Sequence, residues 1–90
     1  MTRQEQCYDI KINRTLNPTN PSEEFARLYS DLASAFDSYV KGKSDIDVKL
    51  GEAGMYLLAI SEMFGIDLED AINKRVDYNL KRKEFLKLIG

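Results

Sequence analysis

The chain has 90 residues, with 13 Lys and Arg against 15 Asp and Glu and a formal net charge of −2. This length predicts one small domain with a marginal core. The absence of His, together with a single Cys, excludes His-based acid–base catalysis, Cys/His zinc sites and an internal disulfide. The charge balance gives no reason to expect a nucleic-acid partner, and no apolar run is long enough to span a membrane. The first residues lack the apolar core of a signal peptide, so we expect a cytoplasmic protein.

Residues 1–19 are predicted to form an N-terminal arm or short helix plus a linker, ahead of a helical domain over residues 20–90. Tyr8, Ile10 and Ile12 alternate with polar residues, as in a strand, but nothing else in the chain is predicted to be β. The stretch NPTNPS contains both prolines of the chain and predicts the linker.

The first long helix is predicted over residues 20–41. Asn20 is a favourable N-cap, Pro21 suits the first helical position, and Gly42 is a suitable C-terminal stop. Apolar residues recur at helical spacing between these ends. They are Phe25, Leu28, Leu32, Ala35, Phe36, Tyr39 and Val40.

A second helix is predicted over residues 45–64, and a third begins at Asp67 after the break at Gly65. Three amphipathic helices with short connections predict an all-α bundle. Apolar stripes of this width cannot all be covered within 90 residues. We therefore expect a homodimer or tetramer whose bundle is completed by oligomerisation. The stripe of the third helix is Leu68, Ala71, Ile72, Val76 and Leu80, with Leu86 and Ile89 as its continuation.

A series of short motifs runs through residues 25–84. In order, they are Leu50-Gly51-Glu52, Tyr56-Leu57-Leu58, the run from Gly65 to Glu69, and Asn79 followed by Lys81 and Arg82. In this order and spacing they resemble the MazG-like nucleoside triphosphate pyrophosphohydrolases, and INRTLN at residues 12–17 is similar to the start of small phage-type members. The resemblance implies an all-α, oligomeric fold and Mg²⁺-dependent hydrolysis of a nucleoside triphosphate to the monophosphate and pyrophosphate.

The family holds its metal with a Glu-Glu-x-x-Glu motif on one helix and a Glu-x-x-Asp motif on the next. The resemblance places these motifs on residues 30–34 and 49–52, where only Asp31 and Glu52 keep a carboxylate. Asp31 and Glu52 are therefore the implied metal-binding and catalytic residues. Serines replace two of the acids and Lys49 replaces a third, so we expect weak Mg²⁺ binding. Lys49 is expected to form an ion pair with Asp31 or Glu52.

The resemblance also implies phosphate contacts from Asn79, Lys81 and Arg82. The alternative is that these cations complement the C-terminal end of a helix. Three functions stay open at this point. The protein is a weakened or inactive hydrolase that binds a nucleotide or a partner protein, an active enzyme with a rearranged site that adds Asp47 or Glu23, or a purely structural interaction module.

Overall fold

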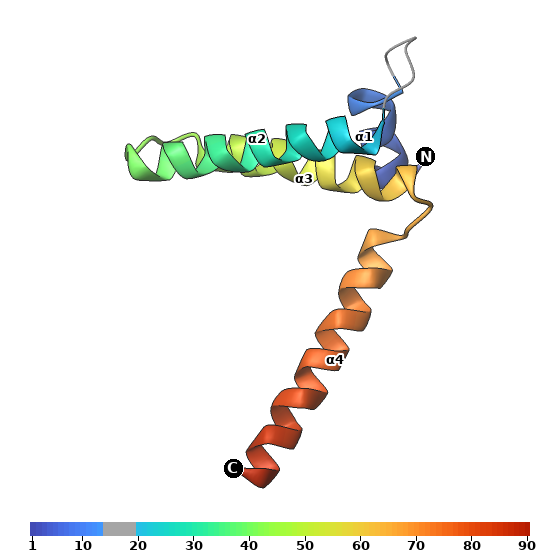
Figure 1. Cartoon of the computed structure of the whole chain (residues 1–90), viewed down its shortest axis with the longest axis vertical. Helices are drawn as coiled ribbons and strands as arrows, with labels where there is room; N and C mark the ends of the chain where they lie inside the picture. The colour runs from blue at the N-terminus through green and yellow to red at the C-terminus, as the bar shows by residue number, and fades with distance from the viewer. Residues whose placement is uncertain (14–19) are drawn as a thin grey trace.

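The computed structural model describes residues 1–13 and 20–90, and helices are the regular secondary structure found in these residues. Its elements are α1 (Arg3–Lys11), α2 (Pro21–Val40), α3 (Ile46–Met63) and α4 (Leu68–Ile89) (Figure 1). The predicted all-α class is confirmed, and the three long helices begin and end close to their predicted positions. Residues 14–19, with most of the predicted linker and part of INRTLN, lie outside the described residues.

Helix α1 begins with a capping box between Thr2 and Glu5. The Glu5 amide donates to Thr2 Oγ1 at 3.1 Å, and the Thr2 amide donates to Glu5 Oε1 at 2.9 Å. The Thr2 amide lowers the pKa of the Glu5 carboxyl because it binds the charged form. Of the two forms considered for the first residues, a short helix is the one present. The alternating pattern is overridden because helical geometry turns Cys7 and Ile12 together against Ala59 of α3.

Helices α2 and α3 form an antiparallel hairpin. Asn20 caps α2 by accepting the Glu23 amide at 2.9 Å, and Gly42 ends the hairpin's first helix with a φ of 68°, a value that favours glycine. The hairpin core is small and consists of Leu28, Ala53, Tyr56 and Ile60. Helix α1 lies against α3, so α3 has a neighbour on each of two sides.

One side of the hairpin carries large apolar residues that remain exposed. On α2 they follow a spacing of four and three residues, which lines them up along one side of a helix. The rings of Phe25 on α2 and Phe64 at the end of α3 lie 6.3 Å apart, so the two helices contribute to one continuous surface. We call this surface the hairpin face, and it consists of Phe25, Tyr29, Leu32, Phe36, Tyr39, Leu50, Leu57 and Phe64.

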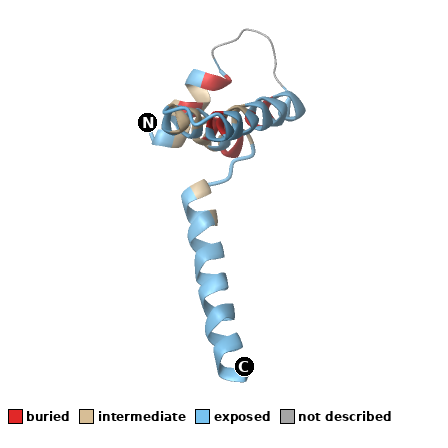
Figure 2. Ribbon diagram, turned by 90° about the vertical axis from the view of Figure 1, so that its left-hand side faces the viewer, coloured by how far each residue is buried: buried red, intermediate tan, exposed pale blue. Residues whose placement is uncertain are grey.

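Helix α4 extends away from the other three helices. Asp67 caps it by accepting the Asp70 amide at 3.1 Å, but none of its 22 residues is buried (Figure 2). The compact unit of one chain is therefore α1 to α3, and α4 does not complete a bundle with them (Figure 1). No helix among the described residues combines the length and apolar character that a membrane span requires.

Candidate functional site

Glu52 lies on α3 and faces α1, where its carboxylate forms an ion pair with the ammonium group of Lys11. Lys11 is only 9% exposed, and its Nζ lies 4.8 Å from the centre of the Tyr56 ring. The capped helix α1 brings Lys11 to this place, because its last turn packs over the middle of α3. Lys11 could not be predicted as a site residue, since a lysine in a short N-terminal segment gives no signal of burial.

Asp31 lies on the stripe of α2 that packs against α3. It is partly buried, and its Oδ2 has no hydrogen-bond partner among the described residues. Glu24 and Ser38 lie seven residues before and after it, on the same stripe, and both are fully buried. Glu24 accepts from Arg27 Nη1 at 3.2 Å through one oxygen, while its second oxygen is buried without a described partner. The side of α2 that faces α3 is thus unusually polar for a helix interface.

Lys49 pairs with neither Asp31 nor Glu52, so that prediction is wrong. Its ammonium lies 3.7 Å from Asp45 at the start of α3, because the i,i+4 spacing places Asp45 one turn before it, while Lys11 takes Glu52. The hydroxyl of Ser38 lowers the pKa of the Asp45 carboxyl most, and Lys49 lowers it further. Ser38 Oγ and Asp45 Oδ1 nevertheless lack a well-aligned hydrogen bond among the described residues.

The resemblance implies Mg²⁺, and the two retained carboxylates are a poor set of ligands for it. Glu52 is already neutralised by Lys11, and the serines at positions 30 and 34 carry no charge. Across residues 1–13 and 20–90, no three Asp, Glu or Cys side chains gather as a metal site requires. Since Mg²⁺ gives up its water only to strongly charged oxygen ligands, we derive no catalytic step through it.

Asn79, Lys81 and Arg82 are exposed on the second half of α4. Because α4 extends away from the hairpin, one chain does not bring these residues together with Asp31 and Glu52 (Figure 1). Any site that uses both groups would need α4 from another chain.

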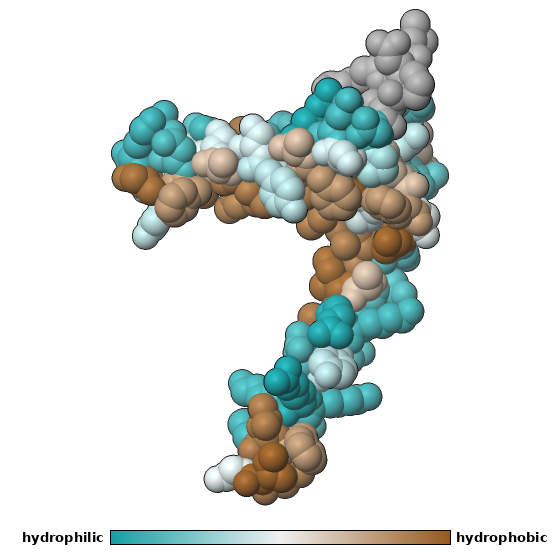
Figure 3. Space-filling model, in the orientation of Figure 1, coloured by the Kyte–Doolittle hydropathy of each residue, from teal (hydrophilic) through white to brown (hydrophobic). Residues whose placement is uncertain are grey.

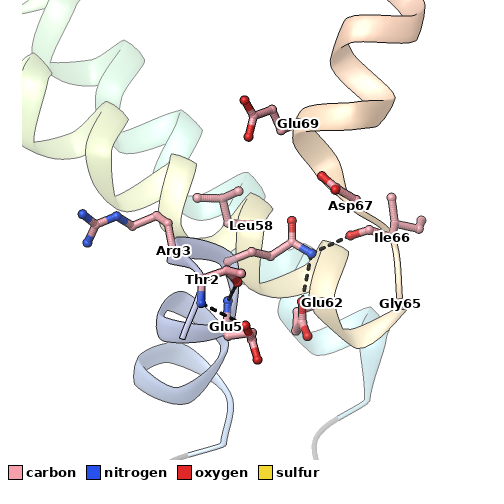
Figure 4. Close-up of a pocket in the computed structure, with 10 residues that line it drawn as sticks. Thr2, Arg3, Glu5, Leu58, Glu62, Gly65, Ile66, Asp67 and Glu69 are labelled. Carbon is pink, nitrogen blue, oxygen red and sulfur yellow. Dashed lines mark hydrogen bonds between the residues drawn. The ribbon is translucent and has the colours of Figure 1, made fainter.

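A pocket of about 430 Å³ lies elsewhere, where α1, the end of α3 and the start of α4 meet (Figure 4). The side chain of Gln4 crosses this junction. Its Nε2 donates to Glu62 Oε2 at 2.9 Å and to the Ile66 carbonyl at 2.5 Å, and its Oε1 accepts from the Leu68 amide at 3.1 Å. Gln4 thus joins three elements, and no sequence motif pointed to it. The pocket is lined by Thr2, Arg3, Gln4, Glu5, Leu58, Glu62, Gly65, Ile66, Asp67 and Glu69.

Comparison of the chain with models of protein families, with curated proteins and with solved structures found no match in any of the three. The MazG-like resemblance therefore stays a prediction drawn from the sequence motifs.

Proposed function

We propose that this protein works by binding and not by hydrolysis. In this proposal it is a homo-oligomeric, MazG-like helical protein that binds a nucleotide or a partner protein and hydrolyses nucleoside triphosphates slowly or not at all. One observation supports it above the others. The only carboxylate that the resemblance retains on α3, Glu52, is paired with the buried ammonium group of Lys11.

An Mg²⁺ site offers negatively charged oxygen atoms, whereas the Lys11 ammonium group places a positive charge beside Glu52. A metal ion at Glu52 would have to displace Lys11, or would lie beside a second positive charge and be repelled by it. Lys11 also makes a cation–π contact with Tyr56, so its displacement would lose two favourable interactions. A nucleotide phosphate, by contrast, needs only cations and hydrogen-bond donors, which Asn79, Lys81 and Arg82 supply in an exposed position.

Self-association is the second part of the proposal, and the exposed hairpin face supports it. Tyr29 and Phe36 are 67% and 66% exposed, and they belong to a surface of eight large apolar side chains. Contiguous apolar surface of this kind on a small protein marks an interaction site. A dimer or a dimer of dimers would cover it.

The decisive experiment measures pyrophosphate release from each standard nucleoside triphosphate with Mg²⁺. We expect little or no release from the natural chain, and the same low value from the double variant Asp31→Ala/Glu52→Ala. Nucleotide binding, measured by calorimetry, should persist in that variant and weaken at least tenfold in Lys81→Ala/Arg82→Ala. A double variant of two exposed carboxylates, Asp37→Ala/Glu84→Ala, serves as the control.

Robust Mg²⁺-dependent release that disappears only in the Asp31 and Glu52 double variant would overturn the proposal and establish an active enzyme. Absence of both turnover and nucleotide binding would favour the second candidate, a structural interaction module. The exposed hairpin face is the observation that favours that candidate, because it provides a protein-binding surface without any nucleotide.

A further inference from the structure

Within the described part of its own chain, helix α4 has little tertiary support beyond the hydrogen bond between its first residue, Leu68, and Gln4. It has 22 residues, none of them buried, and helices of this kind are only marginally stable in water without a packed face. Its apolar residues are spread along its length and are exposed. They are Ile72, Val76, Tyr78, Leu80, Phe85, Leu86, Leu88 and Ile89.

The hairpin of the same chain is not positioned to provide that support. Gln4 binds the backbone on both sides of the connection, at Ile66 and Leu68, and so fixes where α4 begins. Asp67 caps the helix from within the same connection. The connection is therefore held at both ends in the geometry that directs α4 away from α2 and α3 (Figure 1).

The hairpin face is an exposed apolar surface against which a helix such as α4 could pack. Figure 3 shows apolar residues gathered along the side of the hairpin that faces the angle with α4, where the first turns of α4 are also apolar. The lengths agree as well, since 22 residues of α4 extend about 33 Å and 20 residues of α2 about 30 Å at a rise of about 1.5 Å per residue.

The charges of the two surfaces are complementary. Residues 21–63 of the hairpin contain eight acidic and four basic residues, which is a balance of −4. Helix α4, residues 68–89, contains six basic and four acidic residues, which is a balance of +2. Such a pair of surfaces attracts one another before contact and disfavours like-charged alternatives, such as two hairpins face to face.

From these observations we infer that the hairpin face binds helix α4 of a second copy of this chain, and that the exchange is reciprocal. A two-fold axis makes both contacts equivalent, so each copy contributes one helix and receives one. This inference rests on the self-association proposed above and deepens it by naming the two surfaces that meet. The exchange would also carry Lys81 and Arg82 of one copy to the hairpin of the other.

The test uses photo-crosslinking between two distinguishable copies of the full chain. A benzophenone maleimide is attached at Asn79→Cys in ¹⁵N-labelled protein, which is then mixed with unlabelled chain in urea, refolded and irradiated. Cys7 is 2% exposed, and the natural chain treated with the same reagent after refolding reports any reaction there. The matched control carries the reagent at Asp77→Cys, which lies almost opposite position 79 on the helix circumference.

We expect insertion from position 79 into residues 25–40 or 50–64 of the unlabelled copy, at least tenfold above insertion from position 77. Insertion into the labelled copy's own hairpin would show that α4 folds back, and insertion into the partner's α4 would show helix pairing. Either result overturns the inference. If light scattering gives the mass of an oligomer but no crosslinks to the hairpin form, the helix exchange is wrong and the proposed self-association stands. If light scattering gives the mass of a monomer, both the helix exchange and the proposed self-association are wrong.

Discussion

Lys11 changes how the predicted metal site at Glu52 is interpreted. Its ammonium group is buried, and a buried charge is tolerated only with a partner. Glu52 supplies the opposite charge and Tyr56 supplies a ring face, so two interactions stabilise the buried cation. Glu52 is thereby part of the contact that attaches α1 to α3, whatever else it does.

Removal of the Lys11 charge should therefore destabilise the fold. We expect Lys11→Met to lower the free energy of unfolding by about 1–2 kcal/mol, a value between those of exposed and fully buried ion pairs because Glu52 is half exposed. Lys41→Met, which breaks an exposed pair with Asp37, should cost less than about 0.5 kcal/mol. Urea unfolding at equal chain concentrations compares them, and equal losses in the two variants would contradict the structural role of Lys11.

The pKa of Asp45 allows a test at a single carboxyl group. Ser38 lowers this pKa, so the native state holds the Asp45 proton less tightly than the unfolded chain does. The resulting stability is present above the ordinary Asp pKa of about 4 and is lost as the pH falls through the lower, folded pKa. In Ser38→Ala, we expect the Asp45 pKa to move up toward its ordinary value. The difference in the free energy of unfolding between the natural chain and Ser38→Ala should therefore shrink as the pH falls below about 4. It should stay constant between about pH 6 and pH 8.

Carboxyl chemical shifts followed through a pH titration report the Asp45 pKa directly, and urea unfolding at each pH reports the stability. An unchanged Asp45 pKa in Ser38→Ala would show that the serine hydroxyl does not act on it.

Among the elements, α4 depends most on a contact from elsewhere in the chain. Its internal features suffice for a helix: Asp67 caps it, Lys74 pairs with Asp70 at 2.9 Å, and Asp70 raises the pKa of the Lys74 amine. Its direction, however, depends on Gln4, which makes the contacts that tie the start of α4 to α1 and α3. Secondary structure and orientation are thus controlled by different residues.

Loss of the Gln4 side chain should loosen α4 without unfolding it. In Gln4→Ala we expect a broader distance distribution between spin labels at Lys43→Cys and Lys87→Cys, with helix content unchanged by circular dichroism. Gln6→Ala is the matched control, because Gln6 lies two residues further along α1, on nearly the opposite side of the helix, and receives a hydrogen bond from Arg3 within that helix. Dilution of labelled chains with unlabelled ones keeps the measured distances within one molecule. An unchanged distribution in Gln4→Ala would refute the role of Gln4.

At the scale of the whole molecule, the balance of buried and exposed apolar residues decides the behaviour. Among the described residues, eight apolar side chains are buried and several of them are small, whereas the hairpin face and α4 leave larger side chains in contact with water. Small domains bury the smallest fraction of their surface and are the least stable. The exposed apolar side chains support the proposal that a second surface covers the hairpin face and α4.

Charge placed on the hairpin face should separate the assembly. In Tyr29→Lys/Phe36→Lys we expect the light-scattering mass to fall from a multiple of the chain mass to that of a single chain, because the added charges would be buried at the contact. Ser30→Lys, an exposed position on the same helix but away from the face, should keep the mass of the natural chain. A natural chain that is already monomeric at tens of micromolar would contradict the prediction.

The sequence by itself determined the helices. Asn20, Asp67 and the glycines at positions 42 and 65 are local signals, and each acts within a few residues of chain through caps and backbone conformation. The same kind of signal was present at Thr2 and Glu5, but the alternating residues of the first segment obscured it. The assignment of Asp31 and Glu52 as site residues came only from the motifs around them, and it stays a prediction.

Only the tertiary structure decided which charges meet and where the helices go. Lys11 and Glu52 are 41 residues apart, and Gln4 and Leu68 are 64 apart, so no spacing in the chain could pair them. The prediction that Lys49 pairs with Asp31 or Glu52 failed because Lys11, from the helix packed beside α3, takes Glu52, while Lys49 pairs with Asp45 one turn before it. A cap is a local hydrogen bond, but a burial partner depends on how whole helices pack, and that packing is a property of the folded chain.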